Sequence, residues 1–182
     1  PLNVAFRKVA PALVAGNCAI LKPSEIAGLS CMFLGKLAQD AGIPEGVFSI
    51  VTGDRETGAA LVASPSVSMV SFTGSSLTGS KIMEASAPKL SQVALELGGK
   101  SAMVIFEDTD IERAVEATIK GCLTNGGQIC TAHTRLIVQE GIKDDLLEKL
   151  KNVLEKIPYC SDPITERERG DRAWESGVTD VI

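Results

Sequence analysis

Short apolar segments alternate with helix-like segments along most of this 182-residue sequence. The apolar segments are residues 18–22, 47–51, 67–72, 93–97, 102–106 and 136–138, each read as a strand, and Pro23 closes the first as it would close a buried strand. The segments with helical patterning are residues 6–15, 26–41, 57–63, 77–87, 110–122 and 144–157. Parallel strands need a long crossover between them, and that crossover is usually a helix. The alternation therefore predicts an α/β fold with a mostly parallel sheet.

Composition narrows the function before any motif is considered. The sequence is 45% hydrophobic and 4% aromatic, carries a net charge of −5 and has no basic block, so it does not suit nucleic-acid binding. No apolar run reaches the roughly 18 residues of a membrane span, and the first residues are too interrupted for a secretory signal. Five irregularly spaced cysteines favour free thiols in a reducing compartment. We therefore expect a cytoplasmic protein without a membrane partner, and an organelle is the alternative location.

The first chemical motif is FTGSSLTGSK at residues 72–81, where a strand runs through a glycine-bounded turn into a helix. Such a turn points backbone N–H groups and the positive end of the helix at a phosphate. The dinucleotide pattern GxGxxG is absent. The motif is close to a P-loop, but Ser80 precedes Lys81 instead of following it. A plain turn and a P-loop phosphotransferase both stay open on this motif alone.

The second motif is a carboxylate in an apolar strand, Glu96 in VALEL, followed by two glycines. Burial raises the pKa of a carboxyl group and makes it a better base near neutral pH. The glycines let a ligand or another segment of backbone approach. Taken alone, a glutamate that faces solvent or pairs with a lysine is the commoner arrangement.

The third motif is Cys130, directly after the turn NGGQI. A free cysteine is usually a small buried hydrophobe, whereas nearby positive charge or a helix end makes it a nucleophile. A zinc site would combine Cys130 with Cys122, His133 and Cys160, but these spacings do not form two matched pairs. A protease dyad would have to use His133, the only histidine, which lies three residues along the same segment.

Together and in this order, the motifs resemble the NAD(P)-dependent aldehyde dehydrogenase superfamily. The resemblance runs from residue 1 to about Pro163 and is greatest to the betaine-aldehyde and aminoaldehyde dehydrogenases. It is carried by KVAPALVAGNCAILKPSE at residues 8–25, FTGSSLTG at 72–79, LELGGKS at 95–101 and GQIC at 127–130.

The resemblance implies a two-step oxidation of a small aldehyde to a carboxylic acid. Cys130 matches the nucleophile that forms a thiohemiacetal and then a thioester, and Glu96 matches the base that activates water. Lys8 matches a lysine of the active-site wall. The residues that match the cofactor contacts are Lys22, Ser24, Glu25, Gly53, Gly74, Ser75, Gly79, Leu97 and Gly98. Glu25 would repel a 2′-phosphate, so the resemblance implies NAD rather than NADP, and it implies no metal.

The fold implied is that of an incomplete aldehyde dehydrogenase. We expect a partial Rossmann-like NAD-binding domain over residues 1–97, the start of an α/β catalytic domain over 98–160 and a divergent tail over 161–182. The family's oxyanion asparagine would lie just before residue 1, and loss of one such donor typically raises a barrier by about 3–4 kcal/mol.

Two further departures concern the turn at residues 52–58 and the ends of the chain. The turn is one residue shorter than the family's and lacks a glycine, and the segments that make full-length members homo-oligomers are absent. The sequence is thus interpreted as a middle piece of an aldehyde dehydrogenase. The alternative is a non-catalytic nucleotide-binding remnant or a partner of a full-length relative.

Overall fold

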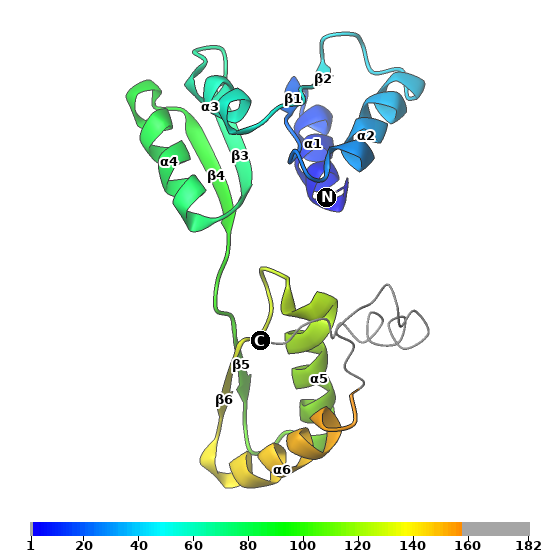
Figure 1. The fold of residues 1–182 in the computed structure, drawn as a ribbon, viewed down its shortest axis with the longest axis vertical. Helices are drawn as coiled ribbons and strands as arrows, with labels where there is room; N and C mark the ends of the chain where they lie inside the picture. The colour runs from blue at the N-terminus through cyan, green and yellow to red at the C-terminus, as the bar shows by residue number, and fades with distance from the viewer. Residues whose placement is uncertain (1, 158–182) are drawn as a thin grey trace. The chain divides into compact units, whose positions relative to one another are not determined.

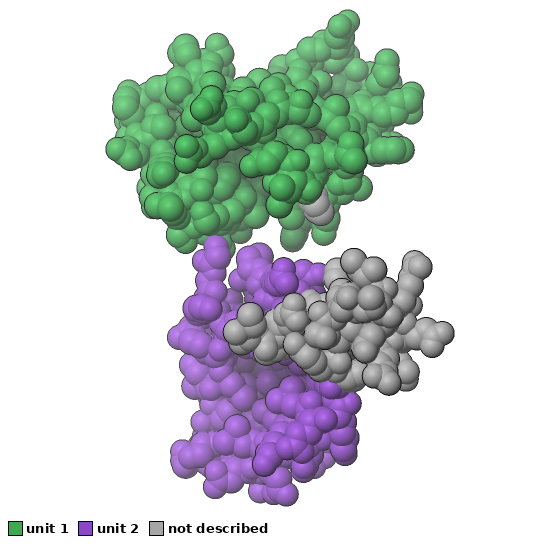
Figure 2. All heavy atoms as spheres, viewed as in Figure 1, with its two compact units in different colours: residues 1–97 green, residues 98–182 purple. Residues whose placement is uncertain are grey.

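The computed structural model describes residues 2–157 and divides into two compact units, residues 1–97 and 98–182. Figure 2 shows the two units in different colours. The tail expected at residues 161–182, and Cys160 with it, lie outside the described residues. Within residues 2–157, no helix combines the length and the apolar character needed to cross a membrane.

The first unit alternates helices and strands, as the sequence predicts (Figure 1). Its elements are α1 (Leu2–Val14), β1 (Ala19–Leu21), α2 (Gly28–Asp40), β2 (Phe48–Ile50), α3 (Arg55–Ala63), β3 (Met69–Gly74), α4 (Ser76–Ser86), the 3-10 turn η1 (Ala87–Lys89) and β4 (Gln92–Leu97). Strand β1 pairs in parallel with β2, and β3 pairs in parallel with β4. The α/β class and the parallel pairing are therefore confirmed, although the described strands form separate two-stranded ladders.

The core under β1 and β2 explains one error in the sequence prediction. Ala5, Cys31 and Leu34 are buried, and Leu21, Phe48 and Ile50 pack against them. Successive side chains of a strand point to opposite faces, so a one-sided core leaves alternate residues outside. Ile20, between two inward residues of β1, is 54% exposed. The apolar run at residues 18–22 is therefore a strand buried on one face within this unit, not on both.

The second unit is a smaller α/β layer. Its elements are β5 (Ala102–Ile105), α5 (Ile111–Leu123), η2 (Thr124–Gly127), β6 (Arg135–Val138), η3 (Glu140–Ile142) and α6 (Lys143–Leu154). Strands β5 and β6 are parallel, and the core beneath them consists of Ile105, Ala114, Val115, Leu146 and Leu150. Asp110 caps α5 as expected, accepting a hydrogen bond from the Arg113 N–H at 3.0 Å.

Candidate functional site

The turn between β3 and α4 has the geometry expected for a phosphate contact. Ser75 is the N-cap of α4, and its Oγ accepts a hydrogen bond from the Thr78 N–H at 3.2 Å. Strand, turn and helix follow one another as the sequence predicts at residues 72–81. The first backbone N–H groups of a helix have no partner within the helix, so they are donors for an anion.

Two glycines of this motif hold the helix and the strands close together. Gly79 is buried, and a Cβ added there would lie 2.9 Å from Leu97 Cδ2 on the neighbouring strand β4. A Cβ on Gly74 would lie 2.4 Å from the Phe72 ring. The structure thus brings together Ser75, Gly79 and Leu97 in the first unit. Gly98 is exposed and begins the second unit.

A hollow of about 330 Å³ opens between the β1–α2 loop and the β2–α3 loop. It is lined by Pro23, Ser24, Glu25, Gly28, Thr52, Gly53 and Asp54. Three residues of the predicted cofactor set, Ser24, Glu25 and Gly53, therefore lie around one cavity. Lys22 joins its two walls, because its Nζ donates hydrogen bonds to the Gly53 carbonyl at 2.7 Å and the Pro23 carbonyl at 3.0 Å.

The turn at residues 52–58, at the edge of this hollow, has its own backbone requirements. Gly53 has a φ of +154°, and a Cβ there would lie 2.1 Å from Thr57 Oγ1. Asp54 is the N-cap of α3 and accepts from the Glu56 N–H at 2.9 Å and the Thr57 N–H at 3.3 Å. Sequence reasoning noted the short turn but missed Asp54. The signal was present, since aspartate directly before a helix is a preferred cap.

The donors around Asp54 also affect its ionisation. Hydrogen bonds from the Thr57 and Glu56 amides lower the pKa of the Asp54 carboxyl group, and the nearby Lys22 charge adds a smaller effect in the same direction. The hollow therefore has a carboxylate on each of its two loops, with Glu25 on one and Asp54 on the other.

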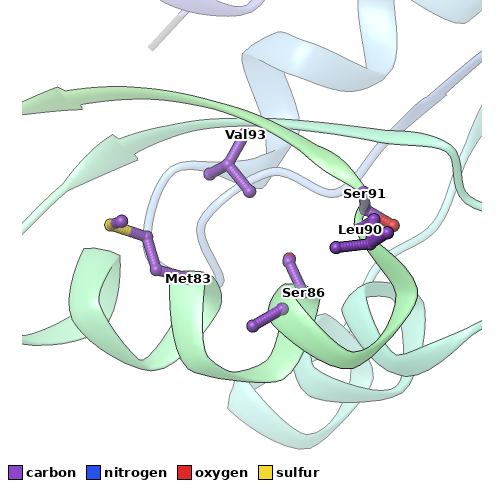
Figure 3. Close-up of a pocket in the computed structure, with 6 residues that line it drawn as sticks. Met83, Ser86, Leu90, Ser91 and Val93 are labelled. Carbon is purple, nitrogen blue, oxygen red and sulfur yellow. The ribbon is translucent and has the colours of Figure 1, made fainter.

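A second hollow of about 390 Å³ lies between the C-terminal end of α4 and the start of β4 (Figure 3). Its lining is mostly apolar and consists of Met83, Ser86, Ala87, Leu90, Ser91 and Val93. None of these is a predicted site residue. The buried Ser86 hydroxyl has no hydrogen-bond partner among the described residues.

The predicted base and the predicted wall lysine both belong to the first unit. Glu96 lies on β4, opposite Thr73 of β3, and it is exposed in this unit. Within the first unit, Glu96 therefore faces solvent, and the apolar residues on either side of it in the sequence do not bury it. Lys8 is half-buried and donates a hydrogen bond from Nζ to Ser71 Oγ at 2.8 Å, which links α1 to β3.

The predicted nucleophile lies in the loop that follows α5 in the second unit (Figure 1). Three consecutive residues, Asn125, Gly126 and Gly127, have φ values of 56°, 63° and 71°, which reverse the chain. The Asn125 side-chain amide donates to the Gln128 carbonyl at 3.0 Å and holds this reversal. Cys130 comes three residues after it and is an exposed free thiol. The buried-hydrophobe interpretation of Cys130 is therefore wrong within this unit.

The only histidine, His133, packs against α5, and no hydrogen bond joins it to Cys130 in the described residues. The His133 N–H donates to the Gly121 carbonyl at 2.9 Å, which closes the loop that carries Cys130. The His133 Nδ1 atom is buried without a partner among the described residues, and it lies 2.2 Å from where a Cβ on Gly121 would stand. Residues 2–157 also contain no group of three side chains suited to hold a metal ion.

Comparison with known proteins identifies the family of this chain. A model of the aldehyde dehydrogenase family matches residues 1–169. The chain belongs to the aldehyde dehydrogenase family. The match extends six residues past Pro163, so the expectation that the family pattern ends there is corrected.

Curated relatives and solved structures match most of this chain. Peroxisomal aminoaldehyde dehydrogenase 1 of Pisum sativum is 50% identical over 167 residues, 91% of this chain and 33% of that protein. Staphylococcus aureus betaine aldehyde dehydrogenase, solved in complex with NAD⁺, matches with a TM-score of 0.81 and 38% identity over 87% of this chain and 32% of that one. An NADP-dependent enzyme of E. coli matches with a TM-score of 0.79 and 40% identity over 84% and 32%. The chain spans about a third of the length of the curated relatives it matches.

Proposed function

We propose that this chain carries the nucleophile and much of the coenzyme site of an NAD-dependent aldehyde dehydrogenase. Its proposed substrate is a small aldehyde of the betaine-aldehyde or aminoaldehyde type. The main support is the exposed Cys130 thiol, held after a left-handed turn in a chain that belongs to this family. An accessible thiol can attack a carbonyl carbon, whereas a buried structural cysteine cannot.

The first unit has features that fit a dinucleotide. Gly79 lets α4 approach β4 closely, and the N-terminal amides of α4 suit a pyrophosphate. The hollow beside Ser24 and Glu25 suits an adenosine ribose. Lys22 uses two of its three ammonium protons on backbone carbonyls, so the third is left for a ribose hydroxyl. Bound NAD would supply the acceptor for the hydrogen and electron pair that leave the aldehyde carbon.

The residue chemistry follows from the two predicted catalytic groups. The Cys130 thiolate forms a C–S bond to the aldehyde carbon, and after oxidation that carbon is held as a thioester. Glu96 accepts a proton from water as the water oxygen attacks the thioester carbon. The C–S bond then breaks, the thiolate is released and the product leaves as a carboxylic acid. The exposure of Glu96 within its unit is compatible with access for that water.

The proposal extends to partners and compartment only as predictions. We expect a small aldehyde as substrate, and we expect full-length members of the family to form homo-oligomers. The cytoplasmic location stays a prediction, with an organelle as the alternative; the pea relative is described as peroxisomal.

The test is NADH fluorescence after the purified 182-residue chain is mixed with NAD and a small aminoaldehyde. We expect a burst of NADH that is lost in Cys130→Ala. Cys18→Ala is the matched control, because Cys18 is also an exposed free cysteine and lies outside the proposed machinery, so the burst should persist. A burst that survives Cys130→Ala would refute the assignment of the nucleophile. NAD binding without any burst from the folded chain would instead support the nucleotide-binding remnant.

A further inference from the structure

The hollow between the β1–α2 and β2–α3 loops has an acidic group on each wall. Glu25 comes from the first loop and Asp54 from the second, and both line the same cavity of about 330 Å³. Lys22 lies 3.9 Å from the Glu25 carboxylate, but its Nζ donates to the carbonyls of Gly53 and Pro23. Among the named groups at this hollow, two carboxylates therefore face one lysine that is already engaged by the backbone.

Asp54 also occupies backbone amides at the start of α3 that would otherwise attract a phosphate to this hollow. The N-terminal amides of a helix such as α3 are natural donors to an anion. Here the Glu56 and Thr57 amides donate to Asp54 Oδ1 at 2.9 and 3.3 Å. The same hydrogen bonds keep the carboxyl group ionised, because they lower its pKa. An anion that reached this end of α3 would meet a fixed negative charge in place of free donors.

We infer that Asp54 is a second specificity residue that excludes the 2′-phosphate of NADP from this hollow, in addition to Glu25. The inference rests on the proposed function, since it assigns the hollow to the ribose of the coenzyme. NAD carries a 2′-hydroxyl there and makes no comparable charge contact. The short turn at residues 52–58 thus contributes to coenzyme choice, because it places the α3 cap at the edge of the cavity.

The expected effect can be estimated from Coulomb's law, with a separation of about 8 Å taken as the span of a cavity of about 330 Å³. A carboxylate and a doubly charged phosphate about 8 Å apart in water repel each other enough to change affinity about fourfold at 10 mM salt and about twofold at 0.15 M salt. The contribution of Asp54 should therefore be clearest at low ionic strength and should shrink as salt is added.

The experiment measures the dissociation constants of NAD and NADP for the 182-residue chain and for Asp54→Asn at both salt concentrations. Asparagine is also a preferred N-cap, so the substitution removes charge while α3 keeps its cap. Asp110→Asn is the matched control, because Asp110 caps α5 in the second unit in the same way. We expect Asp54→Asn to tighten NADP binding about fourfold at low salt, with NAD binding changed by less than twofold and the control unchanged.

The outcomes separate this inference from the proposed function. If NAD binds and Asp54→Asn leaves the ratio of NAD to NADP affinity unchanged, the inference is overturned and the proposed function stands. If Asp110→Asn shifts the ratio equally, the effect is one of overall charge and the inference is also overturned. If no variant binds either dinucleotide while the chain is folded, the proposed function fails and the inference fails with it.

Discussion

Replacing Gly121 by alanine would place a methyl group against the imidazole ring of His133. The added Cβ would lie 2.2 Å from His133 Nδ1, 3.0 Å from Cε1 and 3.1 Å from Cγ. The ring would have to retreat by about 1.2 Å to reach an ordinary contact of 3.4 Å. The His133 backbone cannot carry the ring away freely, because its N–H donates a hydrogen bond to the carbonyl of Gly121 itself in α5.

The magnitude follows from two opposing effects on the free energy of unfolding. Overpacking of this kind typically costs about 1–3 kcal/mol. Alanine in place of glycine within a helix stabilises it by up to about 1 kcal/mol. We therefore expect Gly121→Ala to destabilise the second unit by about 1–2 kcal/mol. In a His133→Ala background, the same change should be stabilising, because only the helix propensity remains.

The assay is a double-mutant cycle in which urea unfolding gives the free energy of unfolding of each chain. The sequence has a single histidine, so the His133 imidazole proton signal reports on the second unit without assignment of other residues; the two His133→Ala chains are followed by the amide exchange of α5. We expect a coupling energy of about 1–3 kcal/mol between the two positions. Equal effects of Gly121→Ala in both backgrounds, within about 0.5 kcal/mol, would refute the reasoning.

Two further predictions concern Gly53 and Asp54 of the first unit, with Gly98, the first residue of the second unit, as the control for Gly53. Gly53→Ala should destabilise the first unit by about 1–3 kcal/mol, since the φ of +154° and the Thr57 side chain both oppose a Cβ. Gly98→Ala should be tolerated, because nothing lies within 4 Å of its Cβ position. Thermal unfolding measures both effects. The lowered pKa of Asp54 means that its stabilisation is present above the ordinary value of 3.8 and is lost as pH falls through the folded-state pKa. The thermal midpoint should thus fall more steeply below pH 3.8 in the native chain than in Asp54→Asn, and parallel curves would contradict this sign.

Local patterns in the sequence were sufficient to predict the type and order of the elements. The helix expected at residues 26–41 begins at Gly28, a shift of two residues, because Pro23 and the following polar residues form a loop that apolar spacing does not show. Asp110 was predictable as a cap because its role depends on the next three residues only. Asp54 has the same local signal, because it is an aspartate directly before a helix.

Exposure was less predictable, because it depends on which face of an element is covered. Ile20 and Glu96 both lie in apolar strand segments, and both are exposed in their unit. A strand pattern gives the alternation of faces but not the layer that packs on each face. The exposure of Cys130 depends likewise on the left-handed run from Asn125 to Gly127, whose backbone direction is a property of the fold and not of the residue types alone.

The residues proposed for the coenzyme and the proposed nucleophile are each held by contacts within one unit of this chain. The hollow, the α4 turn and Lys22 are held by contacts within the first unit, such as the Lys22 bond to Gly53 and the packing of Gly79 on Leu97. Cys130 is held by contacts within the second, above all the His133 bond to Gly121. A change that moves the Cys130 loop, such as Gly121→Ala, should therefore alter thiol reactivity and leave the NAD and NADP dissociation constants unchanged. Asp54→Asn should do the reverse, so cross-effects in either direction would show that the two sites are coupled beyond the local contacts that hold each one.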